Sequence, residues 1–116
     1  MFKLNGTTVI MSRGDTGAMT VSTDGYTFAA EDRADFCVKD EAGEIVIHHV
    51  YPIIQNRFTV AFRNEDTENL EPGEYTWEAR FLVHPYYDSA GEIVNANQIV
   101  SMGIKPFTIL PVVHDI

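Results

Sequence analysis

The side chains that most often carry catalysis are few in this sequence, and they are poorly spaced for it. Cys37 is the only cysteine. It lies between Phe36 and Val38 in a segment that alternates like a strand, so its side chain should point away from theirs. A nucleophile needs a base that a third group orients, and we find no G-x-S-x-G elbow, phosphate-binding glycine loop or H-E-x-x-H pair. We therefore predict a structural thiol, no catalytic residues and no enzyme.

The histidines and acidic residues lack the spacing of a metal site. His48 and His49 are adjacent in a predicted strand, so they should face opposite sides of the sheet. His84 precedes a proline, and His114 lies near the last residue. The acidic residues form short runs typical of solvated turns, and none matches the calcium loop D-x-[DN]-x-[DN]-G. These runs are Asp24, Glu31-Asp32, Asp40-Glu41, Glu44, Glu65-Asp66 and Asp88. We expect no metal ion and no other cofactor.

Two short motifs are candidates for binding. Arg13-Gly14-Asp15 spells a receptor-attachment tripeptide, but Gly-Asp is also a common turn, and we interpret it as a turn. The segment His84-Pro85-Tyr86-Tyr87 opens a predicted loop that runs to Gln98. Aromatic rings in such a loop either pack over the open end of a sandwich or offer a stacking platform for a sugar. Pro85, Tyr86 and Tyr87 are therefore the candidate binding loop.

Length and charge restrict the class of protein. A chain of 116 residues with 45% hydrophobic content fits one folded domain, which we place at residues 1–116. A net charge of −9 disfavours binding to nucleic acids or to anionic membranes, and it favours a basic partner surface. No apolar run is long enough to span a bilayer, and the first residues do not resemble a signal peptide. Together with a single cysteine, which cannot form an internal disulfide, these features predict a protein made and folded in a cytoplasm.

The elements that must position these residues are predicted to be strands. Short alternating runs separated by Gly, Pro, Asp and Asn indicate about seven strands in an antiparallel fold. The clearest run extends from Tyr75 to His84. In residues 45–51, the alternation places Ile45, Ile47, His49 and Tyr51 on one face. The last strand is predicted at 107–113, with Pro106 and Pro111 confining it to a sheet edge. The predicted core residues are Phe36, Val38, Phe58, Val60, Trp77 and Phe81.

Turn motifs narrow the fold further. Residues 40–46 and 88–94 share the pattern Asp-x-Ala-Gly-Glu-Ile-Val, which predicts the same short hairpin turn twice, with Gly in the left-handed conformation. Leu70, Pro72, Gly73 and Tyr75 match a tyrosine corner, in which a Tyr hydroxyl bonds the backbone near a turn between sheets. An ordinary hairpin with a buried Tyr is the alternative. With the strand count, this motif favours an all-β, immunoglobulin-like antiparallel β-sandwich.

Four segments, taken together, resemble the N-terminal immunoglobulin-like domain of phage baseplate upper proteins from prophages of Gram-positive bacteria. The segments are residues 13–17, 35–39, 65–80 and 106–110. The resemblance implies a non-catalytic structural or assembly protein of a phage tail or baseplate. Its partners would be other tail or baseplate proteins or further copies of itself, and it would be built into a phage particle. The alternative is a carbohydrate-binding module that uses Tyr86 and Tyr87.

Overall fold

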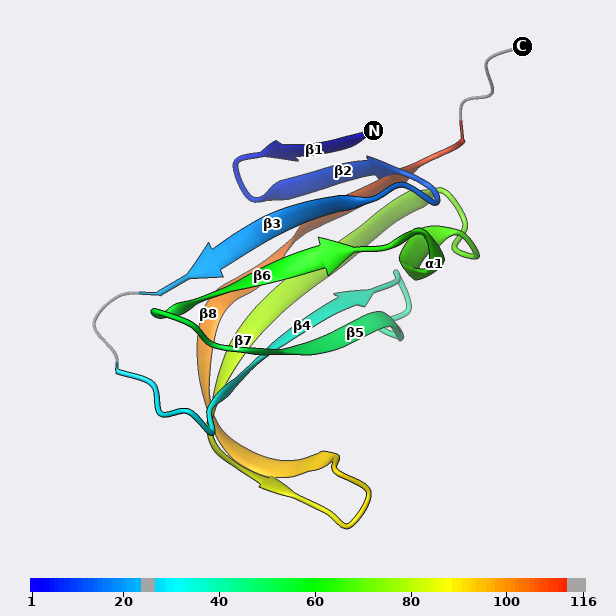
Figure 1. Cartoon of the computed structure of the whole chain (residues 1–116). Coiled ribbons are helices and arrows are strands. Elements are labelled where there is room, and N and C mark those ends of the chain that lie inside the picture. The colour runs from blue at the N-terminus through cyan, green and yellow to red at the C-terminus, as the bar shows by residue number, and fades with distance from the viewer. Residues whose placement is uncertain (24–26, 113–116) are drawn as a thin grey trace.

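The described part of the chain folds into eight strands and one short helix (Figure 1). The computed structural model describes residues 1–23 and 27–112, and for residues 98–102 the backbone alone. Asp24 and His114 therefore lie outside the described residues. The elements are β1 Phe2–Asn5, β2 Thr8–Ser12, β3 Gly17–Ser22, β4 Arg33–Lys39, β5 Ile45–Pro52, β6 Arg57–Phe62, α1 Asn64–Thr67, β7 Gly73–Tyr87 and β8 Ile93–Leu110. The predicted all-β fold is confirmed.

Two sheets face each other and form a β-sandwich. The larger sheet has the order β1-β2-β8-β7-β4-β5, and the smaller one pairs β3 with β6. Every pairing is antiparallel except that of β2 with β8, which is parallel. Figure 1 shows β3 and β6 lying across one face of the larger sheet.

Apolar residues from both sheets fill the space between them. All six predicted core residues are buried, with Phe58 the most exposed at 3%. Aromatic rings connect the two layers: Phe36 meets Phe62 edge-on at 5.6 Å between ring centroids, and Phe58 meets Phe81 at 5.5 Å. Such edge-to-face pairs stabilise a core by about 0.5–1.5 kcal/mol each beyond their burial. The alternation read from the sequence therefore identified the core correctly.

The strand at residues 45–52 differs from its prediction at one end. Ile47 is buried, but Ile45 is 57% exposed, so the two do not share the inner face. The cause is an irregularity in the pairing, because Val38 pairs with Ile47 while the next residue, Lys39, pairs with Ile45. The extra residue in β5 reverses the direction of the side chains beyond it.

The final strand also differs from its prediction. It begins at Ile93, ends at Leu110, and lies between β2 and β7 in the sheet, so it is not an edge strand. Pro106 is accommodated because the pairing with β2 begins only at the next residue, Phe107. Pro111 follows the end of the strand. The predicted loop from His84 to Gln98 is accordingly a hairpin that extends both β7 and β8.

Both predicted hairpin turns are present, and they have the same hydrogen bonds. In both copies, one Asp oxygen accepts two backbone N–H groups at 2.9 Å, from Ala42 and Glu44 in the first and from Ala90 and Glu92 in the second. Gly43 and Gly91 have φ of 82° and 81°, which confirms the predicted left-handed glycine. At the corner motif, the Tyr75 hydroxyl donates to the Glu71 carbonyl at 2.7 Å, which is the type of bond that defines a tyrosine corner.

In the described part of the chain, no helix is long and apolar enough to cross a membrane. The helix α1 is a single turn that supports the segment 13–15. The Thr67 hydroxyl accepts the backbone N–H of Gly14 at 2.8 Å, and the Asn64 amide donates to the Gly14 carbonyl at 2.6 Å. Gly14 has φ of 81°. The Arg-Gly-Asp segment is thus a turn, as predicted, and the helix holds it in place.

Candidate functional site

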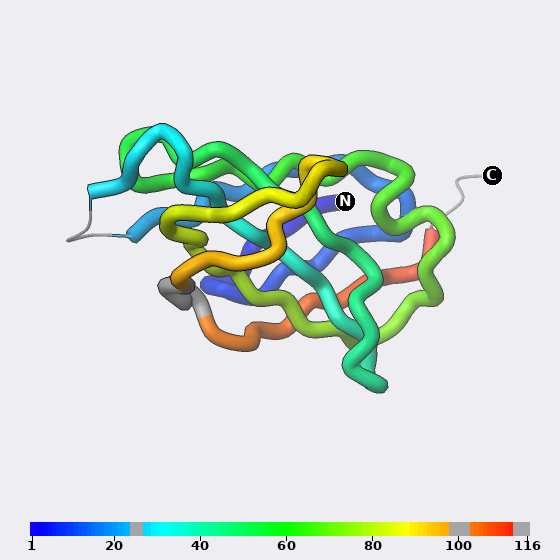
Figure 2. Tube along the Cα trace, turned by 90° about the horizontal axis from the view of Figure 1, so that it is seen from below, coloured from blue at the N-terminus to red at the C-terminus, as the bar shows by residue number. Residues whose placement is uncertain are grey.

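The strands β7 and β8 continue beyond the sandwich as a hairpin, which we call the arm (residues 84–97). In Figure 1 it curls away below the sandwich, and in Figure 2 it is seen from below, crossing the other strands. None of its residues is buried. The arm begins at His84, which has φ of 53°, and the register between β7 and β8 shifts between Val83 and Tyr86. This local distortion of the ladder redirects the hairpin out of the sheet.

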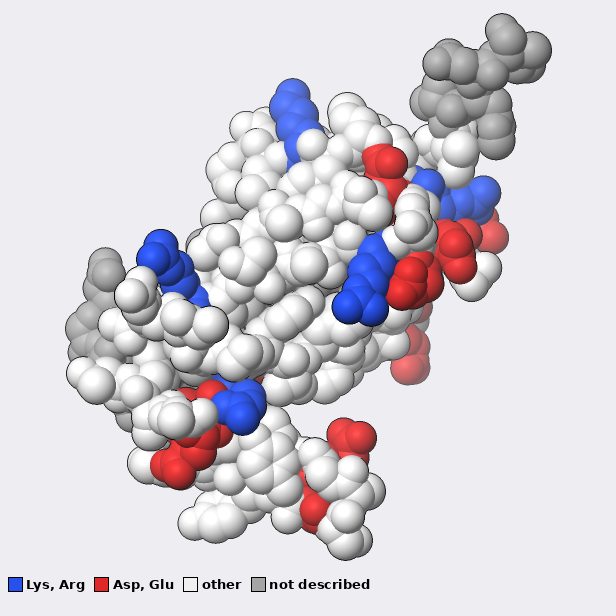
Figure 3. Space-filling model, in the orientation of Figure 1, with Lys and Arg blue, Asp and Glu red and all other residues white. Residues whose placement is uncertain are grey.

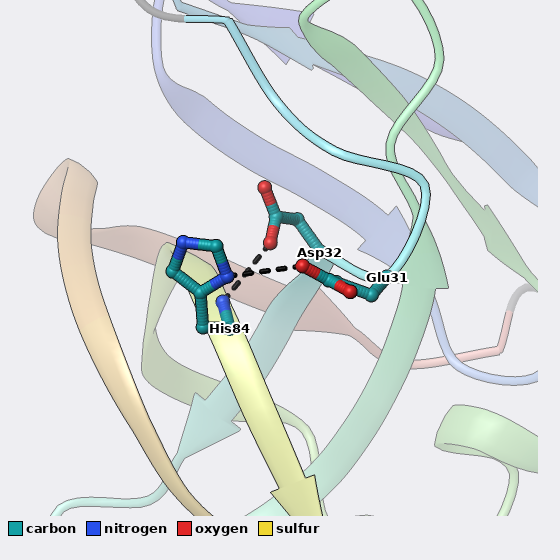
Figure 4. A group of neighbouring side chains, drawn as sticks. All are labelled: Glu31, Asp32 and His84. Carbon is teal, nitrogen blue, oxygen red and sulfur yellow. Dashed lines mark hydrogen bonds and ion pairs between the residues drawn. The ribbon is translucent and has the colours of Figure 1, made fainter.

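A buried carboxylate stabilises the start of the arm. Asp32 is 2% exposed, and its two oxygens accept the backbone N–H of Ala29 at 2.8 Å and that of His84 at 3.0 Å. The His84 ring nitrogen Nδ1 lies 3.0 Å from the Glu31 carboxylate (Figure 4). Glu31, Asp32 and His84 have their ligand atoms within 4.8 Å of one another, close enough to share a metal ion. The Asp32 oxygens are already engaged by the backbone, so the cluster has a structural explanation.

A groove lies between the arm and the outer face of the larger sheet. Its volume is about 500 Å³. One wall is formed by outward side chains of β4, β5 and the body of β7, and the other by the arm from Tyr87 to Ala96. Exposed apolar side chains line the opening, namely Ile45, Val50, Tyr87 and Val94. The groove is therefore open to solvent and apolar at its rim.

The floor of the groove is charged. Asp35 in β4 is 4% exposed and forms an ion pair with Arg80 on the neighbouring strand. The other carboxylate oxygen, Oδ1, lies 2.7 Å from Nε2 of His48, but without the alignment of a hydrogen bond. A buried carboxylate is costly unless it is paired and hydrogen-bonded. Asp35 thus offers an acceptor that its described neighbours do not fully satisfy.

Cys37 also lines this groove, two residues after Asp35 in β4. Its Sγ is 3.5 Å from Glu78 Oε1, which in turn lies 3.1 Å from the Lys39 ammonium. Burial, followed by the charge of Glu78, raises the pKa of the Cys37 thiol to about 11. The hydrogen bond from Lys39 lowers the pKa of the Glu78 carboxyl. A thiol that stays protonated at neutral pH is a poor nucleophile, in agreement with the structural role we expected.

The structure separates the candidate binding residues. Tyr87 lines the groove, whereas Tyr86 is not among its lining residues although it is 65% exposed. Pro85 is partly buried at the irregularity where the arm begins. All three lie on β7, so the prediction that they occupy a loop is wrong. The tyrosines do not form one joint platform.

His48 and His49 face opposite sides of the sheet, as predicted. His48 lies beside Asp35 in the groove, and His49 Nε2 is 2.9 Å from Asp66 Oδ1 at the start of α1. No sequence motif identifies Asp35 or Arg80 as a site residue. The available signal was Asp35, a charged residue between the apolar residues Ala34 and Phe36 in the middle of β4. Such a residue points to a partner on the next strand only once the strand order is known.

The comparisons with known proteins add no relative from which a role could be carried over. No protein-family model, no curated protein and no solved structure matches this chain.

Proposed function

We propose that this chain is a non-catalytic assembly protein that attaches to a partner protein through its arm. The observation that carries the proposal is that residues 84–97 form a hairpin with no buried residue. A two-stranded hairpin gains little stability by itself in water. Tyr86 and Val94 are 65% and 63% exposed. Contact with a partner surface would remove this apolar area from water and so favour attachment.

The distribution of charge also supports attachment through the arm. In the view of Figure 3, charged side chains gather toward the ends of the molecule, and the face over β3 and β6 is largely uncharged. The turn at the tip of the arm carries Asp88 and Glu92, both exposed. With a net charge of −9, the chain suits a partner whose surface is basic where it receives the arm tip.

The resemblance to phage baseplate domains suggests the setting for this attachment. Under this proposal the chain is a component of a prophage tail or baseplate, and its partners are other proteins of that particle. The test is to induce the prophage in the bacterium that carries the gene, purify the particles and count copies of the chain by quantitative mass spectrometry. A fixed copy number per particle is expected. Particles that lack the chain would refute this setting.

Variants of the arm test the attachment itself. Tyr86→Ser and Val94→Ser should each lower incorporation into particles, because each removes apolar area that the partner would cover. Ile104→Ser is the matched control, since Ile104 is 69% exposed and lies in β8 outside the arm. If all three variants are incorporated as well as the natural chain, the arm is not the attachment site.

A carbohydrate-binding role is the second candidate, and the groove favours it. Tyr87 offers a ring 47% exposed, and Asp35, Arg80 and Asn95 offer polar groups on the same lining. Sugars are commonly held by such a combination of an apolar face and a few polar groups. On a glycan array, Tyr87→Ala should abolish binding while Tyr86→Ala preserves it. An array without signal for the natural chain removes this candidate.

A further inference from the structure

The strand β5 forms one edge of the larger sheet and leaves backbone groups without a strand partner. Among residues 1–23 and 27–112, it pairs only with β4. It is eight residues long, from Ile45 to Pro52, and its pairing is regular from Ile47 onward. The opposite edge, β1, has four residues. The outer side of β5 is thus a long, regular row of backbone donors and acceptors.

The middle of this edge lacks the features by which folded proteins prevent pairing between sheets. Edge strands are normally protected by charged residues, above all Lys, by proline or by bulges. The opposite edge carries Lys3, whereas β5 has the sequence IVIHHVYP without Asp, Glu, Lys or Arg. Its irregularity and its proline lie at the two ends of the strand. The middle of β5 is therefore open to a further strand.

Exposed apolar side chains accompany the open edge. Ile45 and Val50 on β5 are 57% and 44% exposed, and Ile54 in the turn that follows is 66% exposed. A strand added beside β5 would cover these side chains as well as satisfy the backbone groups. Both contributions favour a protein strand over a small ligand.

The charge of the chain indicates which protein supplies the added strand. The molecule carries a net charge of −9, so two copies repel each other where their acidic residues approach. Residues 45–64, which include β5 and β6, contain no Asp or Glu. A basic partner would be drawn to the acidic ends of the molecule, whereas a like-charged copy can approach at this neutral strand. The neutral edge thus fits a second copy of the chain.

We propose that two copies of this chain pair through β5, antiparallel and related by a twofold axis, so that their larger sheets become one continuous sheet. The same edge serves both partners, as a twofold interface requires. The interface uses neither the arm nor its tip. It therefore stands independently of the proposed attachment function.

Light scattering or sedimentation over a concentration series provides the test. The natural chain should show a mass of twice 13.0 kDa, falling to the monomer on dilution. Val50→Lys places a charge on the edge of each copy, and it should raise the dissociation constant of the dimer by about tenfold or more. Ile104→Lys, at an exposed position outside the edge, should leave the dimer unchanged.

Two results would overturn the proposal. The first is a natural chain that stays monomeric into the high micromolar range. The second is a dimer that Val50→Lys leaves intact. Circular dichroism verifies the fold of each variant. Should Val50→Lys unfold, Ile45→Glu tests the same edge, because Ile45 is exposed and pairs with Lys39. The arm variant Tyr86→Ser should dimerise normally, which separates this interface from the attachment function.

Discussion

The two copies of one turn allow an internal comparison between the sandwich and the arm. Asp40 and Asp88 each accept two backbone N–H groups at 2.9 Å through one oxygen. Replacing either residue by Ala removes the same two bonds, at a local cost of about 1–2 kcal/mol. The first turn joins β4 to β5, which carry the buried Val38 and Ile47, whereas no residue of the arm is buried. We therefore expect the same local damage to have different global effects.

Asp40→Ala should lower the free energy of unfolding by about 1–2 kcal/mol, because its turn must open when the sandwich unfolds. Asp88→Ala should change it by less than about 0.5 kcal/mol, because the arm can open while the sandwich stays folded. The local cost should instead speed hydrogen exchange in the arm by about tenfold, since 1.4 kcal/mol corresponds to a factor of ten.

Urea unfolding followed by Trp77 fluorescence measures the global free energy of unfolding. Hydrogen exchange resolved by peptide measures the local opening of the arm. Trp77 is 2% exposed in the core, so its emission reports on the sandwich. Equal losses of global stability in the two variants would refute the reasoning, because the arm would then belong to the cooperative core. Unchanged exchange of the arm in Asp88→Ala would refute the estimate for the two turn bonds.

Four further outcomes follow from the same contacts. At pH 8 the Cys37 thiol should react with a disulfide reagent about 90-fold more slowly than an unfolded thiol of pKa 9.0, because a pKa of about 11 leaves little thiolate. Glu78→Gln should speed the reaction, and equal rates in the folded and the unfolded chain would contradict this. Since the folded chain holds this proton more tightly than the ordinary pKa of 9.0 implies, the stability it contributes should be complete below pH 9 and disappear as the pH approaches 11. The loss should be absent in Cys37→Ala, and a variant with the same alkaline loss would show that other groups cause it. Tyr75→Phe should lower stability by about 1 kcal/mol through the lost hydroxyl bond, measured by urea unfolding, and an unchanged midpoint would deny the corner any energetic role. Asp32→Ala should cost about 2–4 kcal/mol by leaving the Ala29 and His84 amides without their acceptor, and a loss below 1 kcal/mol would show that water replaces it.

Much of the fold could be predicted from local patterns. Alternation identified the inner faces of β4, β6 and β7, because successive side chains in a strand point to opposite sides and only one side meets the core. The repeated Asp-x-Ala-Gly-Glu motif predicted its turn because the bonds that make the turn lie within five residues. In the same way, the bond between Tyr75 and Glu71 joins residues only four apart.

The errors arose where pairing between distant strands decided the outcome. The exposure of Ile45 depends on an extra residue relative to β4. Pro85 and the polar residues after it suggest a loop. The structure instead extends β7 and β8 into the arm, because the two strands pair with each other there. Neither effect is contained in a single strand's sequence.

The sequence by itself determined the class of fold, the core residues and the local turns, since these depend on side-chain alternation and on bonds between near neighbours. Only the tertiary structure brought Asp35, His48 and Arg80 into one groove with Tyr87, because they come from β4, β5 and β7, whose order in the sheet no local pattern encodes. It also decided that β5 is an edge and that the arm leaves the sandwich at His84. A site made by neighbouring strands exists only once those strands have paired, so the groove is a property of the folded sheet.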